Sequence, residues 1–150
     1  MKKFLNVYQS ANGIDAALLI ARVAIAALML THGWPKLDML FSGEPVQFPA
    51  LVGLSAAGTL ALAVFAEVVC SLLVLVGLAT RLAALPLILT MLAAVFLVHG
   101  ADPFAQKELG LLYLLIYTML LLAGSGRYSV DYLLQQKMLK EAAVKRFSIQ

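Results

Sequence analysis

The chain has 150 residues, of which 63% are hydrophobic and only 13% are charged, and its formal net charge is +3. A water-soluble domain of this length needs far more polar surface to cover a single core. Because the apolar excess comes in long runs, the sequence indicates one integral membrane domain over residues 1–150, with the lipid bilayer as its solvent. The basic residues gather near the chain ends, which favours a role in membrane topology and argues against nucleic-acid binding.

Four apolar stretches are close to the ~20 residues that a helix needs to cross a ~30 Å hydrocarbon core. The expected spans are residues 15–34, 59–78, 82–99 and 106–124. The connection Ala79-Thr80-Arg81 is short, which predicts that the second and third helices are antiparallel neighbours. The sequence therefore predicts an all-α membrane protein, a bundle of four transmembrane helices.

Two segments lie outside these spans. Residues 46–57 are apolar but too short to cross, so we expect a re-entrant or interfacial piece between the first two helices. The tail, residues 127–150, contains a candidate helix from Val130 to about Phe147, with Ser129 as its N-cap and Asp131 in its first turn. Four basic residues follow along it, Lys137, Lys140, Lys145 and Arg146. Such a basic helix is expected at the membrane surface or in the cytoplasm.

The distribution of Lys and Arg predicts the orientation of the bundle. If both termini are cytoplasmic, that side holds Lys2, Lys3, Arg81, Arg127, Lys137, Lys140, Lys145 and Arg146. The opposite side then holds only Lys36 and Lys107. We therefore expect a multi-pass protein with both termini in the cytoplasm.

An ionised group in the hydrocarbon costs roughly 2.5–3.5 kcal/mol, so each ionisable residue near a span needs a reason. These residues are Arg22, His32, Lys36, Glu67, His99 and Glu108. At ~1.5 Å per residue, Arg22 and Glu67 lie about 10 Å and about 18 Å above the inner ends of their helices. An Arg22–Glu67 ion pair is therefore feasible. It would either fix the helix register or form one wall of a substrate or proton site.

The two histidines fall at matching heights, about 25 Å and about 27 Å from the inner ends of their helices. Lys36 follows His32 by one turn, and Glu108 opens the fourth helix at the same level. The sequence therefore predicts a polar pocket near the outer face, lined by His32, Lys36, Glu67, His99 and Glu108, with Arg22 below it. Gly33 would allow another helix or a ligand to approach the first helix closely.

Two His and one or two Glu could in principle bind zinc or iron, but HxxxH and ExxH spacings are absent and histidines on separate helices more commonly form hydrogen bonds, so no metal site is predicted. Tyr113 and Tyr117, four residues apart, are expected to form a core or lipid-facing stripe rather than a quinone site. The lone cysteine, Cys70, is expected to be a buried apolar residue. No nucleotide-binding or hydrolytic motif is present, so the sequence identifies no catalytic residue.

Several short motifs occur in a fixed order along the chain. They are Arg22, Gly33-Trp34-Pro35-Lys36-Leu37, Glu67, Gly77-Leu78-Ala79-Thr80-Arg81-Leu82-Ala83-Ala84, Glu108 and Gly126-Arg127-Tyr128-Ser129-Val130-Asp131. On these motifs, which cover most of residues 15–131, the chain resembles the DoxX family of small bacterial membrane proteins. The resemblance implies a four-span bundle in the bacterial inner (plasma) membrane. It also implies a link to redox biology, since the family is named for a subunit of a quinol oxidase linked to thiosulfate oxidation and has relatives tied to oxidative stress.

The leading hypothesis is a membrane subunit of a redox or quinone-linked complex, with a quinone as candidate cofactor and a redox-complex protein as partner. If the chain takes part in an enzyme, it is then an oxidoreductase subunit that is not catalytic alone. The alternative is a non-catalytic membrane scaffold or small-solute carrier that recruits a partner through its basic tail. The sequence leaves the substrate and homo-oligomerisation open.

Overall fold

Helices account for nearly all the regular structure of residues 11–147, the part of the chain that the computed structural model describes, with side chains from Asn12 to Ala142. In chain order they are α1 (Ala11–Phe41), α2 (Ala56–Val64), the π-helical η1 (Phe65–Cys70), α3 (Ser71–Val76), α4 (Thr80–Ala93), the π-helical η2 (Ala94–Val98), α5 (Phe104–Ala123) and α6 (Val130–Phe147). Lys2 and Lys3, which entered the predicted orientation, lie outside the described residues, as do the side chains of Lys145 and Arg146.

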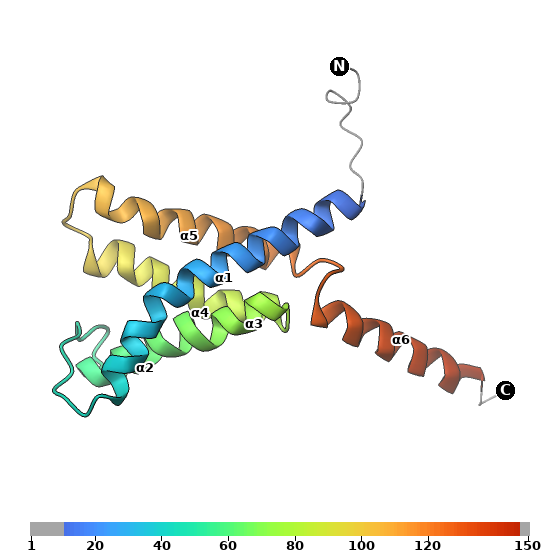
Figure 1. Cartoon of the computed structure of the whole chain (residues 1–150), viewed down its shortest axis with the longest axis horizontal. Helices are drawn as coiled ribbons and strands as arrows, with labels where there is room; N and C mark the ends of the chain where they lie inside the picture. Colours follow the sequence, from blue (N-terminus) through green and yellow to red (C-terminus); the bar gives the residue numbers. More distant parts are fainter. Residues whose placement is uncertain (1–10, 148–150) are drawn as a thin grey trace, which may run out of the picture.

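Four continuous helical segments of the described chain are long and apolar enough to cross a membrane, and we call them the first to fourth rods. They are Asn12–Phe41, Ala56–Val76, Thr80–Val98 and Phe104–Ala123. They confirm the predicted all-α fold of four membrane-spanning helices, which Figure 1 shows packed as one bundle with α6 outside it. The second rod is continuous from α2 through η1 to α3, and the third from α4 to η2.

The first helix is longer than predicted, because it continues through Pro35 to Phe41 instead of ending at Trp34. A proline inside a helix removes one hydrogen bond and costs about 3 kcal/mol. The last two turns offset this cost by packing: Leu37 and Leu40 lie against a buried cluster formed by Leu60, Val64 and Val68 of the second rod.

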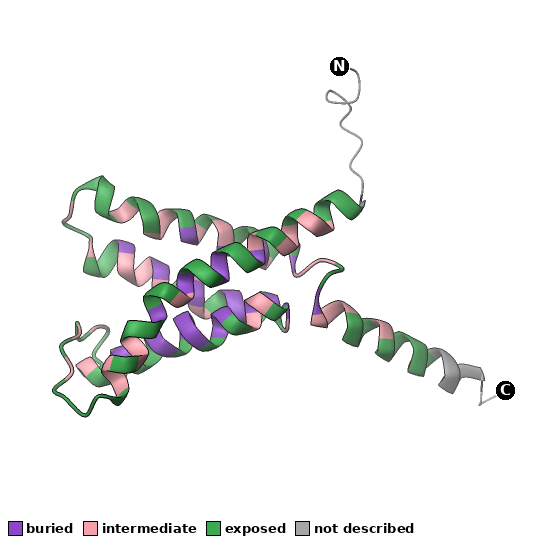
Figure 2. Cartoon of the chain, viewed as in Figure 1, coloured by how far each residue is buried: buried purple, intermediate pink, exposed green. Residues whose placement is uncertain are grey.

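The main core lies where α1, α3, α4 and α5 face one another. Its buried side chains are Ile25, Ala26, Met29, Cys70, Val74, Ala83, Leu87, Met91, Tyr113, Tyr117 and Leu120. Figure 2 shows these buried positions on the inner faces of the helices, with exposed residues along the outer faces. Because the outer faces carry many large apolar side chains, such as Ile20, Leu89 and Leu122, the bundle is built for a lipid surrounding. Cys70 is in the core, as predicted, and of the two positions left open for Tyr113 and Tyr117, the core and the lipid-facing side, the structure shows the core.

A tight turn joins the second and third rods, as the sequence predicted, but it runs over residues 77–79, and Thr80 and Arg81 already belong to α4. Gly77 has φ +73°, and the amide of Leu78 donates to the carbonyl of Leu73, the pattern of a left-handed helix C-cap. The third rod begins three residues later, at Thr80. The two rods are therefore antiparallel neighbours.

Residues 42–55, between α1 and α2, contain no helix. Val46 and Phe48 from this segment pack against the cluster of Leu60, Val64 and Val68. Ser55 then caps α2, since its hydroxyl accepts a hydrogen bond from the amide of Gly58 at 3.2 Å. The placement of this segment in or on a membrane stays a prediction.

The tail helix α6 begins at the predicted residue. Ser129 caps it, because its Oγ accepts a hydrogen bond from the amide of Tyr132 at 3.2 Å. The preceding segment runs back to the start of α1, where the amide of Arg127 donates to Asp15 Oδ1 at 2.9 Å. The start of α1 and the end of α5 therefore lie at one end of the bundle, as four spans require. Which side of the membrane this end faces stays a prediction.

Candidate functional site

A cavity of about 210 Å³ lies at the end of the bundle where α1 ends and α5 begins. We call it the Glu67 cavity. Its lining residues are Met29, His32, Lys36, Glu67, Met91, Ala94, Val95, His99, Gln106, Leu109, Gly110 and Tyr113. His32, Gln106 and Leu109 are exposed, so the cavity reaches the molecular surface. It combines apolar walls with a few convergent polar groups, which is typical of a small-molecule site.

A charged contact in the cavity joins α1 to η1. Lys36 Nζ donates a hydrogen bond to Glu67 Oε1 and forms an ion pair with it. The Glu67 side chain is only 2% exposed, whereas that of Lys36 is 28% exposed. Because a buried carboxylate is costly without a partner, Lys36 stabilises the charge of Glu67. The second carboxylate oxygen, Oε2, is buried and has no hydrogen-bond partner among the described residues.

Each histidine of the cavity has a partner of its own. The ring of His32 meets that of Tyr113 edge-on, with centroids 5.8 Å apart and an interplanar angle of 87°. His99 ends η2, and its Nδ1 lies 2.8 Å from Asp102 Oδ2. This contact fixes the ring, so that Nε2 remains for another partner.

Both π-helical segments border the Glu67 cavity. η1 carries Glu67, and η2 contributes Ala94 and Val95 to the lining. A π-helical turn shifts the register of the side chains that follow it and is found frequently at functional sites. The α-helical geometry of the second and third rods is thus interrupted beside this cavity. This observation supports a functional site there independently of the charged residues.

The structure brings together four of the six predicted pocket residues, His32, Lys36, Glu67 and His99. Glu108 is exposed and does not line the cavity. At 100° per residue, Glu108 points away from the face of α5 that carries Gln106, Gly110 and Tyr113. That this face lines the pocket was not predicted from the sequence. Gly110 and Tyr113, three residues apart on one side of α5, are the pattern that could have indicated it.

The predicted Arg22–Glu67 pair is wrong. Arg22 is fully buried, and its Nη2 donates to the carbonyl of Tyr128 near the opposite end of the bundle. It lies 14 residues before Lys36, or about 21 Å along the helix. The prediction failed because it set the inner ends of α1 and the second rod at equal heights. In the structure Arg22 lies against Gly77, at the end of the second rod.

The topology residues Arg81, Arg127 and Asp131 lie at the same end of the bundle as Arg22, where all three line one cavity. Asp131 accepts hydrogen bonds from the amides of Ala79 at 2.7 Å and Thr80 at 3.1 Å, and so caps α4. Arg81 Nη2 donates to the carbonyl of Leu122 at 3.2 Å, near the end of α5. The Asp131 contacts tie the segment after α5 to the start of α4, and the Arg81 contact ties α4 to the end of α5.

Metal binding and the close approach at Gly33 were the remaining questions from the sequence. Among the described residues, no group of three or more His, Cys, Asp and Glu side chains is placed to hold a metal ion. Gly33, predicted as a close-approach position, is buried against Glu67 and Val68.

Fold and site together define a multi-span membrane protein whose bundle holds, at one end, an open cavity with apolar walls and a few charged and polar groups. The DoxX family model matches residues 17–100. The chain is also 31% identical over 138 residues to the uncharacterized membrane protein Rv3486 of Mycobacterium tuberculosis, an alignment covering 81% of this chain and 83% of the relative. The chain belongs to the DoxX family. No solved structure matches it.

Proposed function

We propose that the chain is a subunit of a redox or quinone-linked complex of the bacterial inner membrane, and that the Glu67 cavity holds the polar headgroup of a quinol. The observation that carries this proposal is the ion pair of Lys36 with the buried Glu67, in a cavity that also offers His32 and His99. A quinol headgroup needs hydrogen-bond partners and a proton acceptor, and these side chains supply both. In the predicted orientation, the cavity faces the outer side.

The chemistry of the cavity residues fits this ligand. Glu67 Oε2 is buried and unpartnered among the described residues, so it is placed to accept a proton or a hydrogen bond. His99 is held by Asp102 and can donate or accept through Nε2. Met29, Met91 and Leu109 provide the apolar surface that an aromatic headgroup needs. A bound quinol would supply the two-electron chemistry, while these residues bind its hydroxyls and accept its protons.

The test is retention of quinone by the full chain, purified in mild detergent and extracted for mass spectrometry. Glu67→Gln, His32→Ala and His99→Ala are each expected to lower the quinone content at least several-fold. Glu108→Gln is the matched control for Glu67→Gln, because it makes the same change outside the cavity. Equal quinone content in all four variants and the unchanged protein would refute the proposal.

A second candidate function is a membrane scaffold or small-solute carrier that recruits a partner through its tail. Its supporting observation is that α6 projects away from the bundle (Figure 1) and exposes Leu133, Leu134, Met138 and Leu139 beside Lys137. Ending the chain after Asp131 keeps the cap of α4 and removes most of α6. Under this alternative the shortened bundle folds but loses its partner, whereas an unchanged pull-down counts against it.

A further inference from the structure

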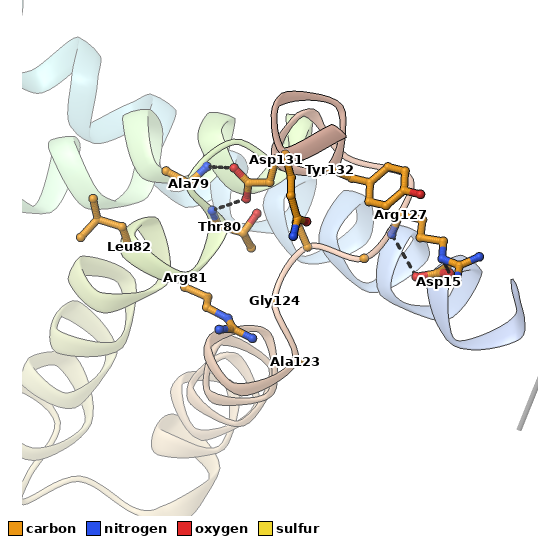
Figure 3. Close-up of a pocket in the computed structure, with 13 residues that line it drawn as sticks. Asp15, Ala79, Thr80, Arg81, Leu82, Ala123, Gly124, Arg127, Asp131 and Tyr132 are labelled. Carbon is orange, nitrogen blue, oxygen red and sulfur yellow. Dashed lines mark hydrogen bonds and ion pairs between the residues drawn. The ribbon is translucent and has the colours of Figure 1, made fainter. Parts of the chain in front are cut away.

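The opposite end of the bundle holds a second and larger cavity, of about 590 Å³, which the proposed function does not use. We call it the Arg81 cavity (Figure 3). Its lining residues are Asp15, Ala79, Thr80, Arg81, Leu82, Ala123, Gly124, Ser125, Gly126, Arg127, Asp131, Tyr132 and Gln135. Its volume lies within the range of ~300–1,000 Å³ that is usual for small-molecule sites.

Two arginines and two aspartates line this cavity, but only the arginines have hydrogen-bonding groups left for a ligand. Both oxygens of Asp131 are occupied by the amides of Ala79 and Thr80. Both oxygens of Asp15 face Arg127, one bonded to its amide and one 3.4 Å from its Nε. Figure 3 shows these two contacts at separate places in the cavity wall. The acidic oxygens are therefore already engaged, whereas donors of the guanidinium groups remain.

Arg81 is the main free donor. Only its Nη2 donates to the described residues, to the carbonyl of Leu122, and its side chain lies beside Gly124, which has no Cβ to cover it. Arg127 is 57% exposed, and its contact to Asp15 uses only Nε. The unused N–H donors of Arg81 form a fork for the oxygens of a phosphate or carboxylate group, and Arg127 adds a second positive charge elsewhere in the cavity wall (Figure 3).

The position of the cavity selects among anionic ligands. It lies at the start of α4 and the end of α5, where two membrane-spanning rods terminate. This is the level of the lipid headgroups. Leu82 and Leu122 are 69% and 74% exposed beside it, so apolar surface for acyl chains continues from the cavity along both helices.

We propose that the Arg81 cavity binds the phosphate group of an anionic phospholipid. Arg81 donates to the phosphate oxygens, and Ser125, Arg127 and Gln135 line the same cavity for the rest of the headgroup. The bound lipid joins the start of α4 and the end of α5 to the start of α6. Asp131 of α6 already bonds to the start of α4. This site is independent of the Glu67 cavity and of any quinone.

The first experiment titrates the purified full chain with dioleoyl phosphatidylglycerol or dioleoyl phosphatidylcholine and counts bound lipids by native mass spectrometry. The expected result is tighter binding of phosphatidylglycerol, and Arg81→Gln should weaken it about tenfold, the effect of losing one charged hydrogen bond. Lys107→Gln removes the same charge at the other end of the bundle and should leave the affinity unchanged. Equal losses in both variants would show general charge attraction and overturn the proposal.

A second pair of variants avoids any effect of Arg81 on folding. Gln135→Glu adds an anion to the wall of the cavity at an exposed residue, whereas Gln136→Glu adds the same charge at a neighbour that does not line it. Only the first should weaken phosphatidylglycerol binding, by repulsion of the phosphate. Identical affinities for the two variants contradict the site. Displacement of the lipid by inorganic phosphate at equal concentration would overturn the lipid as the ligand.

Discussion

Gly33 of α1 lies directly against Glu67 of η1. A Cβ built on this glycine would stand 3.1 Å from the Cβ of Glu67 and 2.8 Å from Cγ2 of Val68. The absence of a side chain at residue 33 thus sets the distance between α1 and the second rod. Lys36, one turn further along α1, reaches Glu67 because the two helices are this close.

The first prediction is that Gly33→Ala destabilises the bundle by about 1–3 kcal/mol and separates Lys36 from Glu67, because the new methyl group has no space. Thermal unfolding of the purified protein in detergent measures the loss. The control is Gly58→Ala, whose new Cβ would have its nearest neighbour at 3.4 Å, an ordinary contact. This control should be neutral or slightly stabilising. Similar unfolding temperatures for the two variants would show that α1 can move aside without cost.

The second prediction concerns the ion pair itself. Lys36→Met leaves the carboxylate of Glu67 buried and without its cation, so we expect a loss of about 3–5 kcal/mol. Adding Glu67→Met to the same chain removes the stranded charge and should recover much of the stability. The measurement is a double-mutant cycle on the unfolding free energy. Additive losses would mean that the two side chains do not interact in the folded protein.

The sequence predicted the fold well because the hydrocarbon imposes a strong pattern: long apolar runs end at charges, glycines and prolines. The level of the Glu67 cavity also followed, since His32 and His99 can be counted along their helices. Partner choice did not follow. Glu67 pairs with Lys36 instead of Arg22 because α1 is set against the second rod by Gly33, and this contact depends on the three-dimensional fit of two surfaces.

Helix phase was the second source of error. Glu108 was placed in the pocket by its height alone, but its direction on α5 takes it to the exposed face. The same limitation hid Tyr113, which lies in the core and also lines the cavity. α5 is a regular α-helix, so counting 100° per residue gives both directions there; after the π-helical turns of η1 and η2 the same count would fail.

The third prediction tests the cap of α4. Asp131→Ala removes the acceptor of the Ala79 and Thr80 amides and should cost about 1–2 kcal/mol. Asp131→Asn keeps one acceptor oxygen and should lose less. Amide hydrogen exchange at the start of α4 is the local measurement, with Asp38→Ala on the exposed face of α1 as the control. Unchanged protection of these amides in Asp131→Ala would contradict the capping role.

The fourth prediction separates two effects of glycine at the turn between the second and third rods. Gly77 and Gly53 both have left-handed backbones, with φ of +73° and +77°. A Cβ at Gly53 meets nothing within 4 Å, so Gly53→Ala bears only the conformational cost of about 1–2 kcal/mol. A Cβ at Gly77 would lie 1.8 Å from Nη1 of Arg22 and 2.7 Å from Cβ of Ser129, so Gly77→Ala must also displace the buried guanidinium.

We therefore expect Gly77→Ala to be at least several kcal/mol less stable than Gly53→Ala, since it adds the expulsion of a buried charge to the same backbone strain. Arg22→Ala in the same chain removes the clash with the guanidinium but leaves the contact with Ser129. If Arg22 is the obstacle, the double variant should be more stable than the sum of the two single losses predicts. Unfolding in detergent gives all four values. A strictly additive result would mean that the guanidinium moves freely out of the way, and that Gly77 is required only for its backbone conformation and for the space beside Ser129.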